Sequence, residues 1–214
     1  MGDQDAPPFG SVAIVGVGLI GGSIALGIRE RWPSVRVFGV DRPAVLAHAA
    51  GSGALDKALS SVAELPGVEL VILAAPVRQN ARLLTELPAH VRQSAIVTDV
   101  GGTKRDMQKA AAVVGPSLQF VGGHPIGGAE HGGFGFARPD LFRGRPWILT
   151  PTAADADADA VRRLTRLAEG LGARPVTMDA AEHDRVMAFV SHLPQLATSA
   201  LMEVIGSAVQ GEGL

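Results

Sequence analysis

A run of glycines that directly follows a short apolar segment constrains the fold of this chain more than any other feature. The run is Gly16-Val-Gly18-Leu-Ile-Gly21, and it comes immediately after the apolar residues 12–15. Between a strand and a helix, the first glycine permits a tight turn and the second lets a pyrophosphate approach the backbone. The third lets the helix pack closely on the strand, with the helix N-terminus facing the phosphates. The pattern predicts a dinucleotide-binding unit, and a glycine-rich turn without a ligand is the alternative.

Further apolar runs follow the first, and stretches compatible with helices separate most of them. The runs are at residues 12–15, 35–40, 68–73, 95–98, 118–121 and 147–149, and a last short strand is expected at 174–177. Strands that are apolar on both faces suit a parallel sheet covered by helices on both sides. An amphipathic helix is expected from Asp155 to Leu171, with Gly172 ending it. The sequence therefore predicts an α/β domain with a doubly wound, Rossmann-like sheet.

The pattern changes after Met178, where we place a boundary between residues 1–178 and 179–214. The second part is expected to form one long helix with an apolar stripe made of Val186, Val190, Leu193, Ala197, Leu201 and Val204. Pro194 lies inside this helix and has no amide hydrogen, so we expect a kink or break there. A lone apolar helix needs further helices or a second subunit to cover its stripe. We therefore expect the start of an incomplete all-α substrate-binding and dimerisation domain, and a homodimer formed through the C-terminal helices.

Composition excludes several classes of function. The 214 residues include no cysteine, which rules out disulfides, cysteine-based zinc sites and thiol nucleophiles and suits the cytoplasm. The net charge of -2, with scattered lysines and arginines, offers no basic surface to a nucleic acid. No apolar run is long enough to cross a bilayer, and the acidic N-terminus lacks the features of a signal peptide. We expect a cytoplasmic protein that acts on a small molecule, without nucleic-acid or membrane partners.

Four positions outside the glycine turn are expected to contact the cofactor. Asp41 closes the second strand about twenty residues after the last fingerprint glycine, where a carboxylate bonds the ribose hydroxyls of NAD. The neighbouring Arg42 could accommodate the 2′-phosphate of NADP, so NAD is favoured and NADP stays open. Ala75 and Pro76 follow the third strand, at the edge of the sheet where ligands bind, although Pro76 also suits a simple turn. The predicted cofactor site also includes Gly16, Gly18, Leu19, Ile20 and Gly21.

A second glycine-rich segment contains the predicted general base. The sequence Gly-Gly-His124-Pro125-Ile-Gly-Gly-Ala-Glu130 follows the fifth strand, at the same edge as the glycine fingerprint. Pro125 biases His124 toward an extended backbone, and the glycines let a ligand approach closely. A neutral imidazole can take a proton from a substrate hydroxyl while the adjacent carbon gives hydride to nicotinamide. His124 is therefore the predicted base, and a purely structural histidine is the alternative.

The segment around His124 resembles the signature of the prephenate and arogenate dehydrogenase family. So does a later segment, His183-Asp-Arg-Val-Met-Ala-Phe-Val-Ser191-His192-Leu-Pro194, and the resemblance covers nearly the whole chain in order. Members of this family use NAD(P) for the oxidative decarboxylation of prephenate or arogenate in tyrosine biosynthesis. The resemblance implies that His124 contacts the ring hydroxyl as hydride leaves.

The resemblance also implies roles for two loops. Thr103 stands where a serine usually contacts the substrate and the catalytic histidine, so it is included among the catalytic residues. Thr103 and Asp106 also fit a local helix cap that needs no substrate. Glu130 is expected to gate or polarise the site, as its family counterpart does, and a simply solvated carboxylate is the alternative. Gly128 and Ala129 are expected beside the substrate.

The long helix is expected to supply the last group of site residues. The resemblance places His192 in the substrate pocket, together with Ser191 and Gln195, and Gln195 replaces a histidine that many members have. His183 lies nine residues before His192 and on the opposite side of an ideal helix, so the two are a poor metal site. We interpret His183 as structural and predict no metal.

Three functions stay open on the sequence alone. The first is oxidative decarboxylation of prephenate or arogenate, or of 4-amino-4-deoxyprephenate in secondary metabolism. The second is a hydroxyacid or imine oxidoreductase, which normally needs a catalytic lysine that residues 179–209 do not contain. The third is a nucleotide-binding module with little activity, because the arginine that grips a substrate carboxylate in the family has no match here.

Overall fold

One eight-stranded sheet dominates the computed structural model, which describes residues 6–114, 118–152 and 158–211. The strands are β1 (Ser11–Val15), β2 (Arg36–Val40), β3 (Lys57–Leu59), β4 (Leu70–Leu73), β5 (Ile96–Asp99), β6 (Gln119–Pro125), β7 (Pro146–Thr150) and β8 (Arg174–Thr177). They lie in the order β3-β2-β1-β4-β5-β6-β7-β8, and only the β6–β7 pair among them is antiparallel. The order reverses between β1 and β4, which creates the switch point where dinucleotides bind in such sheets.

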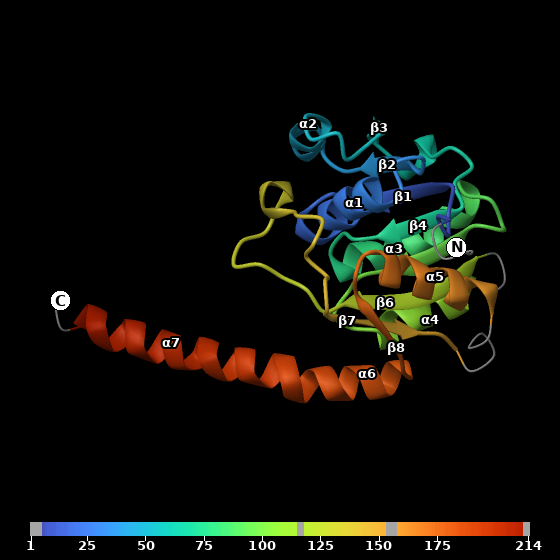
Figure 1. Ribbon diagram of the computed structural model, residues 1–214. Coiled ribbons are helices and arrows are strands. Elements are labelled where there is room, and N and C mark those ends of the chain that lie inside the picture. Colours follow the sequence, from blue (N-terminus) through green and yellow to red (C-terminus); the bar gives the residue numbers. More distant parts are fainter. Residues whose placement is uncertain (1–5, 115–117, 153–157, 212–214) are drawn as a thin grey trace.

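Helices cover both faces of this sheet (Figure 1). They are α1 (Leu19–Arg31), α2 (Pro43–Ala50), α3 (Val77–Glu86), α4 (Arg105–Val114) and α5 (Asp159–Gly170), with short 3-10 turns at Val62–Glu64, Leu87–Ala89 and Phe134–Phe136. The helices α1 and α5 share one apolar core with Ile72 of β4, while α3 and α4 share the other with its neighbours Val71 and Leu73. The strands of this sheet are apolar on both faces because helices bury both faces.

The predicted doubly wound α/β fold is confirmed, with two differences. The short strand β3 was not predicted, because Lys57 and Ala58 are exposed at the sheet edge and form no apolar run. The return of β7 antiparallel to β6 was not predicted either. Residues 126–145 between them contain a 3-10 turn in place of a crossover helix, so the chain can fold back beside β6.

Some sequence-based expectations fall on residues that lie outside the described ones. The expected helix from Asp155 to Leu171 corresponds to α5, but residues 153–157 are not described, so its predicted start is not tested. The outer ends of the two predicted domains, residues 1–5 and 212–214, are likewise outside the described part.

The predicted long helix is present and extends away from the sheet domain (Figure 1). It begins with α6 (Ala180–Met187), whose N-terminal amides of Ala181 and Glu182 bond the side chain of Asp179. A π-helical turn, Ala188–His192, joins α6 to α7 (Leu193–Gly211). Because Pro194 cannot donate and crowds the preceding turn, the wider π turn takes the place of the predicted kink or break.

The second half of the long helix is apolar and uncovered. Its exposed large side chains, with those of the π turn, are Phe189, Val190, Leu193, Leu196, Leu201, Met202, Val204, Ile205 and Val209. They include Val190, Leu193, Leu201 and Val204 of the predicted apolar stripe. No helix in the described ranges is long and apolar enough to span a membrane.

Candidate active site

The glycine fingerprint has the geometry that a dinucleotide requires. Gly16 has a φ of +99°, and a Cβ atom there would lie 2.5 Å from the backbone of Ala74 and Ala75. A Cβ atom on Gly21 would overlap the carbonyl oxygen of Gly16, so this glycine lets α1 approach the turn closely. Gly18 has no neighbour within 4 Å of its Cβ position, which leaves open space at the N-terminus of α1. A pyrophosphate fits there, against the backbone amides and the positive end of the helix.

The remaining predicted cofactor residues surround this turn. Asp41 follows β2, and its carboxylate accepts hydrogen bonds from the amides of Val17 and Arg42, both at 2.7 Å. The Arg42 side chain is 86% exposed, against 17% for Asp41. Ala75 and Pro76 lie at the end of β4, where Gly16 approaches the chain. Leu19 and Ile20 form the first turn of α1, so the predicted cofactor positions share one edge of the sheet.

His124 lies at the same edge, inside a strand. The sequence placed it in a loop after residues 118–121, but β6 runs on to Pro125 because its last four residues pair with β7. His124 pairs with Ile148, so the sheet fixes its backbone. A Cβ atom on Gly102 would lie 3.7 Å from Nε2 of His124, so this loop borders the imidazole.

A buried histidine and a carboxylate hold the other side of the His124 ring. Nδ1 of His124 lies 2.8 Å from Nε2 of His183, and Nδ1 of His183 lies 2.8 Å from Oδ1 of Asp184. The His183 side chain is fully buried. The sequence analysis interpreted His183 as structural and did not place it beside His124. An adjacent His-Asp pair near the start of a helix was the available signal.

Asp184 also caps α4, and this corrects the predicted local cap. Its two carboxylate oxygens accept hydrogen bonds from the amides of Lys104 at 2.8 Å and Arg105 at 3.0 Å. Among the described hydrogen bonds, none joins Thr103 to Asp106, and Asp106 bonds Lys109 instead. A carboxylate from another helix thus fills the place that the pattern assigned to Thr103.

A buried ion pair lies behind β6, the strand that carries His124. The ammonium of Lys104 is 2.5 Å from Asp99 and 2.6 Å from the carbonyl oxygen of Gly123, which precedes His124. Asp99 also accepts hydrogen bonds from the amides of Gly101 and Gly123. Burial raises the pKa of Asp99 and lowers that of Lys104, and each charge opposes this effect on the other. The sequence analysis did not identify either residue as part of the site.

Burial and nearby charges keep His124 neutral. Burial lowers its pKa first, electrostatic interactions with His183, Lys104 and His192 lower it further, and the carboxylate of Asp184 opposes them. The resulting pKa is about 4. A neutral imidazole is the form that can accept a proton at physiological pH.

The other predicted site residues differ in their exposure to solvent. Thr103 is half-buried in the loop after β5, and His192 is half-buried in the π turn. Two predicted groups are exposed, namely Ser191 and Gln195 on the long helix and Gly128, Ala129 and Glu130 in the loop after β6.

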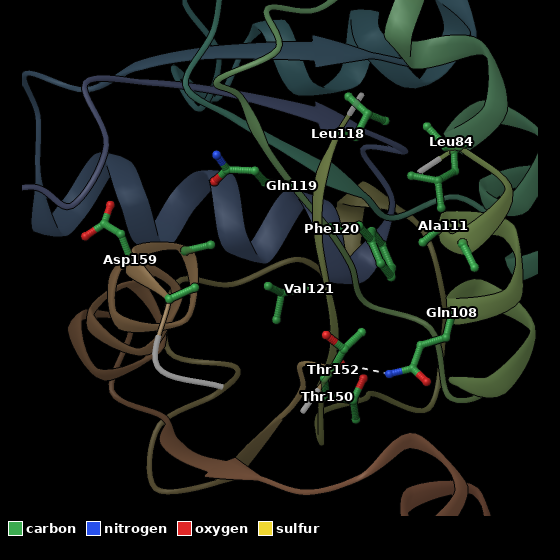
Figure 2. Close-up of a pocket in the computed structure, with 14 residues that line it drawn as sticks. Leu84, Gln108, Ala111, Leu118, Gln119, Phe120, Val121, Thr150, Thr152 and Asp159 are labelled. Carbon is green, nitrogen blue, oxygen red and sulfur yellow. Dashed lines mark hydrogen bonds between the residues drawn. The ribbon is translucent and has the colours of Figure 1, made fainter. Parts of the chain in front are cut away.

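A separate cavity of about 630 Å³ lies near the beginning of β6, between α4 and α5 (Figure 2). Leu118, Phe120 and Val121 line it, and Gln108 bonds the carbonyl oxygen of Thr150 at its margin. None of the predicted site residues belongs to this lining. The cavity is therefore distinct from the site around His124.

The fold and the site define the nucleotide-binding part of an oxidoreductase. The glycine fingerprint and a neutral histidine occupy the same edge of a doubly wound sheet. The family model described as "Prephenate dehydrogenase, nucleotide-binding domain" matches residues 24–177. The chain belongs to the prephenate dehydrogenase family.

Individual relatives agree with this assignment. The chain is 39% identical over 197 residues to a prephenate dehydrogenase of Bacillus subtilis, an alignment covering 90% of this chain and 53% of the relative. It is 32% identical over 194 residues to the enzyme of Lactococcus lactis, with 89% and 52% covered. The crystal structure of prephenate dehydrogenase from Aquifex aeolicus with hydroxyphenyl propionate and NAD+ superposes with a TM-score of 0.83 at 32% identity, covering 91% of this chain and 68% of that one. The chain thus spans about half the length of the two curated relatives.

Proposed function

We propose that the protein catalyses the NAD-dependent oxidative decarboxylation of prephenate or arogenate, which yields 4-hydroxyphenylpyruvate or tyrosine. The observation that carries this proposal is the neutral imidazole of His124 at the edge that also holds the glycine fingerprint. The family assignment supports it. Both substrates have a ring hydroxyl on the carbon that is oxidised and a carboxylate on the opposite ring carbon.

The proposed reaction uses His124 as a general base. Its imidazole accepts the proton of the ring hydroxyl as the C–H bond on the same carbon breaks and its electron pair leaves as hydride. NAD, when bound, supplies the hydride acceptor. The ring carboxylate is then lost as carbon dioxide, and the electron pair of that bond makes the ring aromatic. His124 returns its proton to the ring oxygen, so the histidine is regenerated.

NAD is proposed as the cofactor in preference to NADP. The carboxylate of Asp41 lies at the end of β2, beside the fingerprint turn, where it can accept hydrogen bonds from the ribose hydroxyls. The same carboxylate repels a 2′-phosphate. The Arg42 side chain is exposed, and its Nε lies 4.0 Å from the Asp41 carboxylate, at the outer limit of an ion pair.

The uncovered long helix supports a homodimer. Large apolar side chains are exposed along it from Phe189 to Val209, and apolar patches of this kind mark sites of protein–protein interaction. We propose that the C-terminal helices of a second copy cover it. Size-exclusion chromatography with light scattering tests this proposal, and a monomer at micromolar concentration would contradict it.

The first experiment measures NADH formation with prephenate, arogenate and 4-amino-4-deoxyprephenate, each with NAD and with NADP. The third substrate is included because a Streptomyces pristinaespiralis protein named 4-amino-4-deoxyprephenate dehydrogenase is 30% identical over 146 residues. We expect turnover that falls on the order of 10²- to 10⁴-fold in His124→Asn. NAD binding without turnover on any of the three substrates would instead support a nucleotide-binding module.

A further inference from the structure

Three side chains, one of them that of the proposed base, form a continuous hydrogen-bonded chain. It runs from Asp184 through His183 to His124, and both links are 2.8 Å long. His183 is fully buried, so water does not compete for either of its ring nitrogens. The two imidazole rings meet edge to face, with 5.1 Å between their centroids.

The protonation of this chain follows from its fixed end. Asp184 accepts hydrogen bonds from the amides of Lys104 and Arg105 at the N-terminus of α4, where a negative charge is favoured. Burial alone would raise the pKa of Asp184, but the hydrogen bonds from His183 and these two amides lower it. The carboxylate is therefore ionised and can only accept, so Nδ1 of His183 must donate.

The remaining protons are then determined one after another. A neutral His183 that donates from Nδ1 has an unprotonated Nε2, which must accept from Nδ1 of His124. A neutral His124 that donates from Nδ1 has its lone pair on Nε2. This atom faces the loop after β5, 3.7 Å from the Cβ position of Gly102.

We propose that His183 and Asp184 are positioning residues that fix His124 in the tautomer whose free base is Nε2. This inference rests on the proposed function, in which His124 accepts the proton of the ring hydroxyl. It adds that the basic nitrogen is selected by two residues that do not touch the substrate.

The positioning pair lies outside the nucleotide-binding domain as the family model delimits it. The match to the family model ends at residue 177, whereas His183 and Asp184 belong to α6, the first segment of the long C-terminal helix. Their bonds to His124 and to the start of α4 span 59 to 80 residues of sequence. The first helix after the sheet domain, α6, therefore supplies the two residues that orient His124.

The first test is spectroscopic and does not need a substrate. In protein labelled with 15N at histidine, we expect the His124 Nδ1 signal to be that of a protonated nitrogen and its Nε2 signal that of an unprotonated one. In His183→Leu, which is close in size but accepts no hydrogen bond, we expect both tautomers to be populated. A wild-type protein in which Nε2 carries the proton would overturn the proposal, whether or not the enzyme is active.

The second test separates positioning from folding. His183→Gln can place an amide oxygen near the position of Nε2, so it should retain most of the kcat, while His183→Leu should lose on the order of 10- to 100-fold, within the range of a general base. The KM for NAD should stay unchanged in both. Equal losses in the two variants, at equal melting temperatures, would contradict the positioning role.

The same data distinguish the two proposals. Wild-type protein with the expected tautomer but no turnover on any substrate would refute the proposed function and leave the positioning pair intact. Turnover with the opposite tautomer would refute the positioning role and leave the proposed function intact.

Discussion

The ammonium of Lys104 lies 2.5 Å from the carboxylate of Asp99, and both side chains are fully buried directly behind the strand of His124. The pair joins three segments, because its atoms also bond the backbone of Gly101 and Gly123. A buried charge without its partner is strongly unfavourable. The pair therefore fixes the loop after β5 and the strand of His124 relative to each other.

Lys104→Met should destabilise the protein by about 3–5 kcal/mol, because it leaves the Asp99 carboxylate buried and uncompensated. The free energy of unfolding from urea denaturation measures this. Asp99→Asn combined with Lys104→Met should recover part of the loss, since no charge is then buried. As a matched control, Lys109→Met removes an exposed lysine of α4 and should change stability by less than about 0.5 kcal/mol. A Lys104→Met variant as stable as the control would show that the ion pair does not contribute to the free energy of unfolding.

The pKa of His124, about 4, predicts the acid limit of activity. The base must be neutral, so activity is present above this pKa and is lost as the pH falls through it. For an unperturbed histidine the same loss would begin near pH 6.5. We expect kcat/KM to stay constant from neutral pH down to about pH 5 and to fall below that. Circular dichroism at each pH separates this titration from acid unfolding, and a midpoint near pH 6.5 in folded protein would contradict the prediction.

The sequence predicted most of the fold because the relevant signals are local. Apolar runs and the glycine fingerprint each lie within a few consecutive residues, and burial on both sheet faces explains them. The edge strand β3 carries no such run, since two of its three residues are exposed. The antiparallel return of β7 depends on how residues 126–145 cross the sheet edge, which no local pattern encodes.

The candidate site was predicted only in part for the same reason. His124 and the cofactor turn stand in glycine-rich motifs that can be recognised from sequence. The His183 contact joins residues 59 positions apart, and the Asp184 cap joins residues 80 apart, so helical periodicity could not reveal them. Lys104 and Asp99 are only five residues apart, but their burial depends on the packing of β6 and α6 around them.

Asp41 should determine the preference between the two cofactors. Asp41→Ala removes the acceptor for the ribose hydroxyls and the charge that repels a 2′-phosphate. We expect NAD to bind about 10- to 100-fold more weakly, as the loss of hydrogen bonds to a charged group costs roughly 1.5–3 kcal/mol, while NADP binding improves. Isothermal titration calorimetry with both cofactors measures the change. Arg42→Ala is the control, because this exposed side chain should affect NAD little, and an unchanged NAD affinity in Asp41→Ala would place the ribose elsewhere.

Gly102 should control access to the basic nitrogen of His124. Its Cβ position is at ordinary contact distance, 3.7 Å from Nε2, so a methyl group fits but a branched side chain would occupy the space in front of that atom. We expect Gly102→Val to lower kcat/KM at least about 10-fold, because a displacement of the substrate hydroxyl by 1 Å is costly for proton transfer. NAD affinity and melting temperature should change little. Gly132→Val is the matched control, since nothing lies within 4 Å of its Cβ position and the residue is exposed. Equal activity of the two variants would mean that the substrate reaches Nε2 from another side.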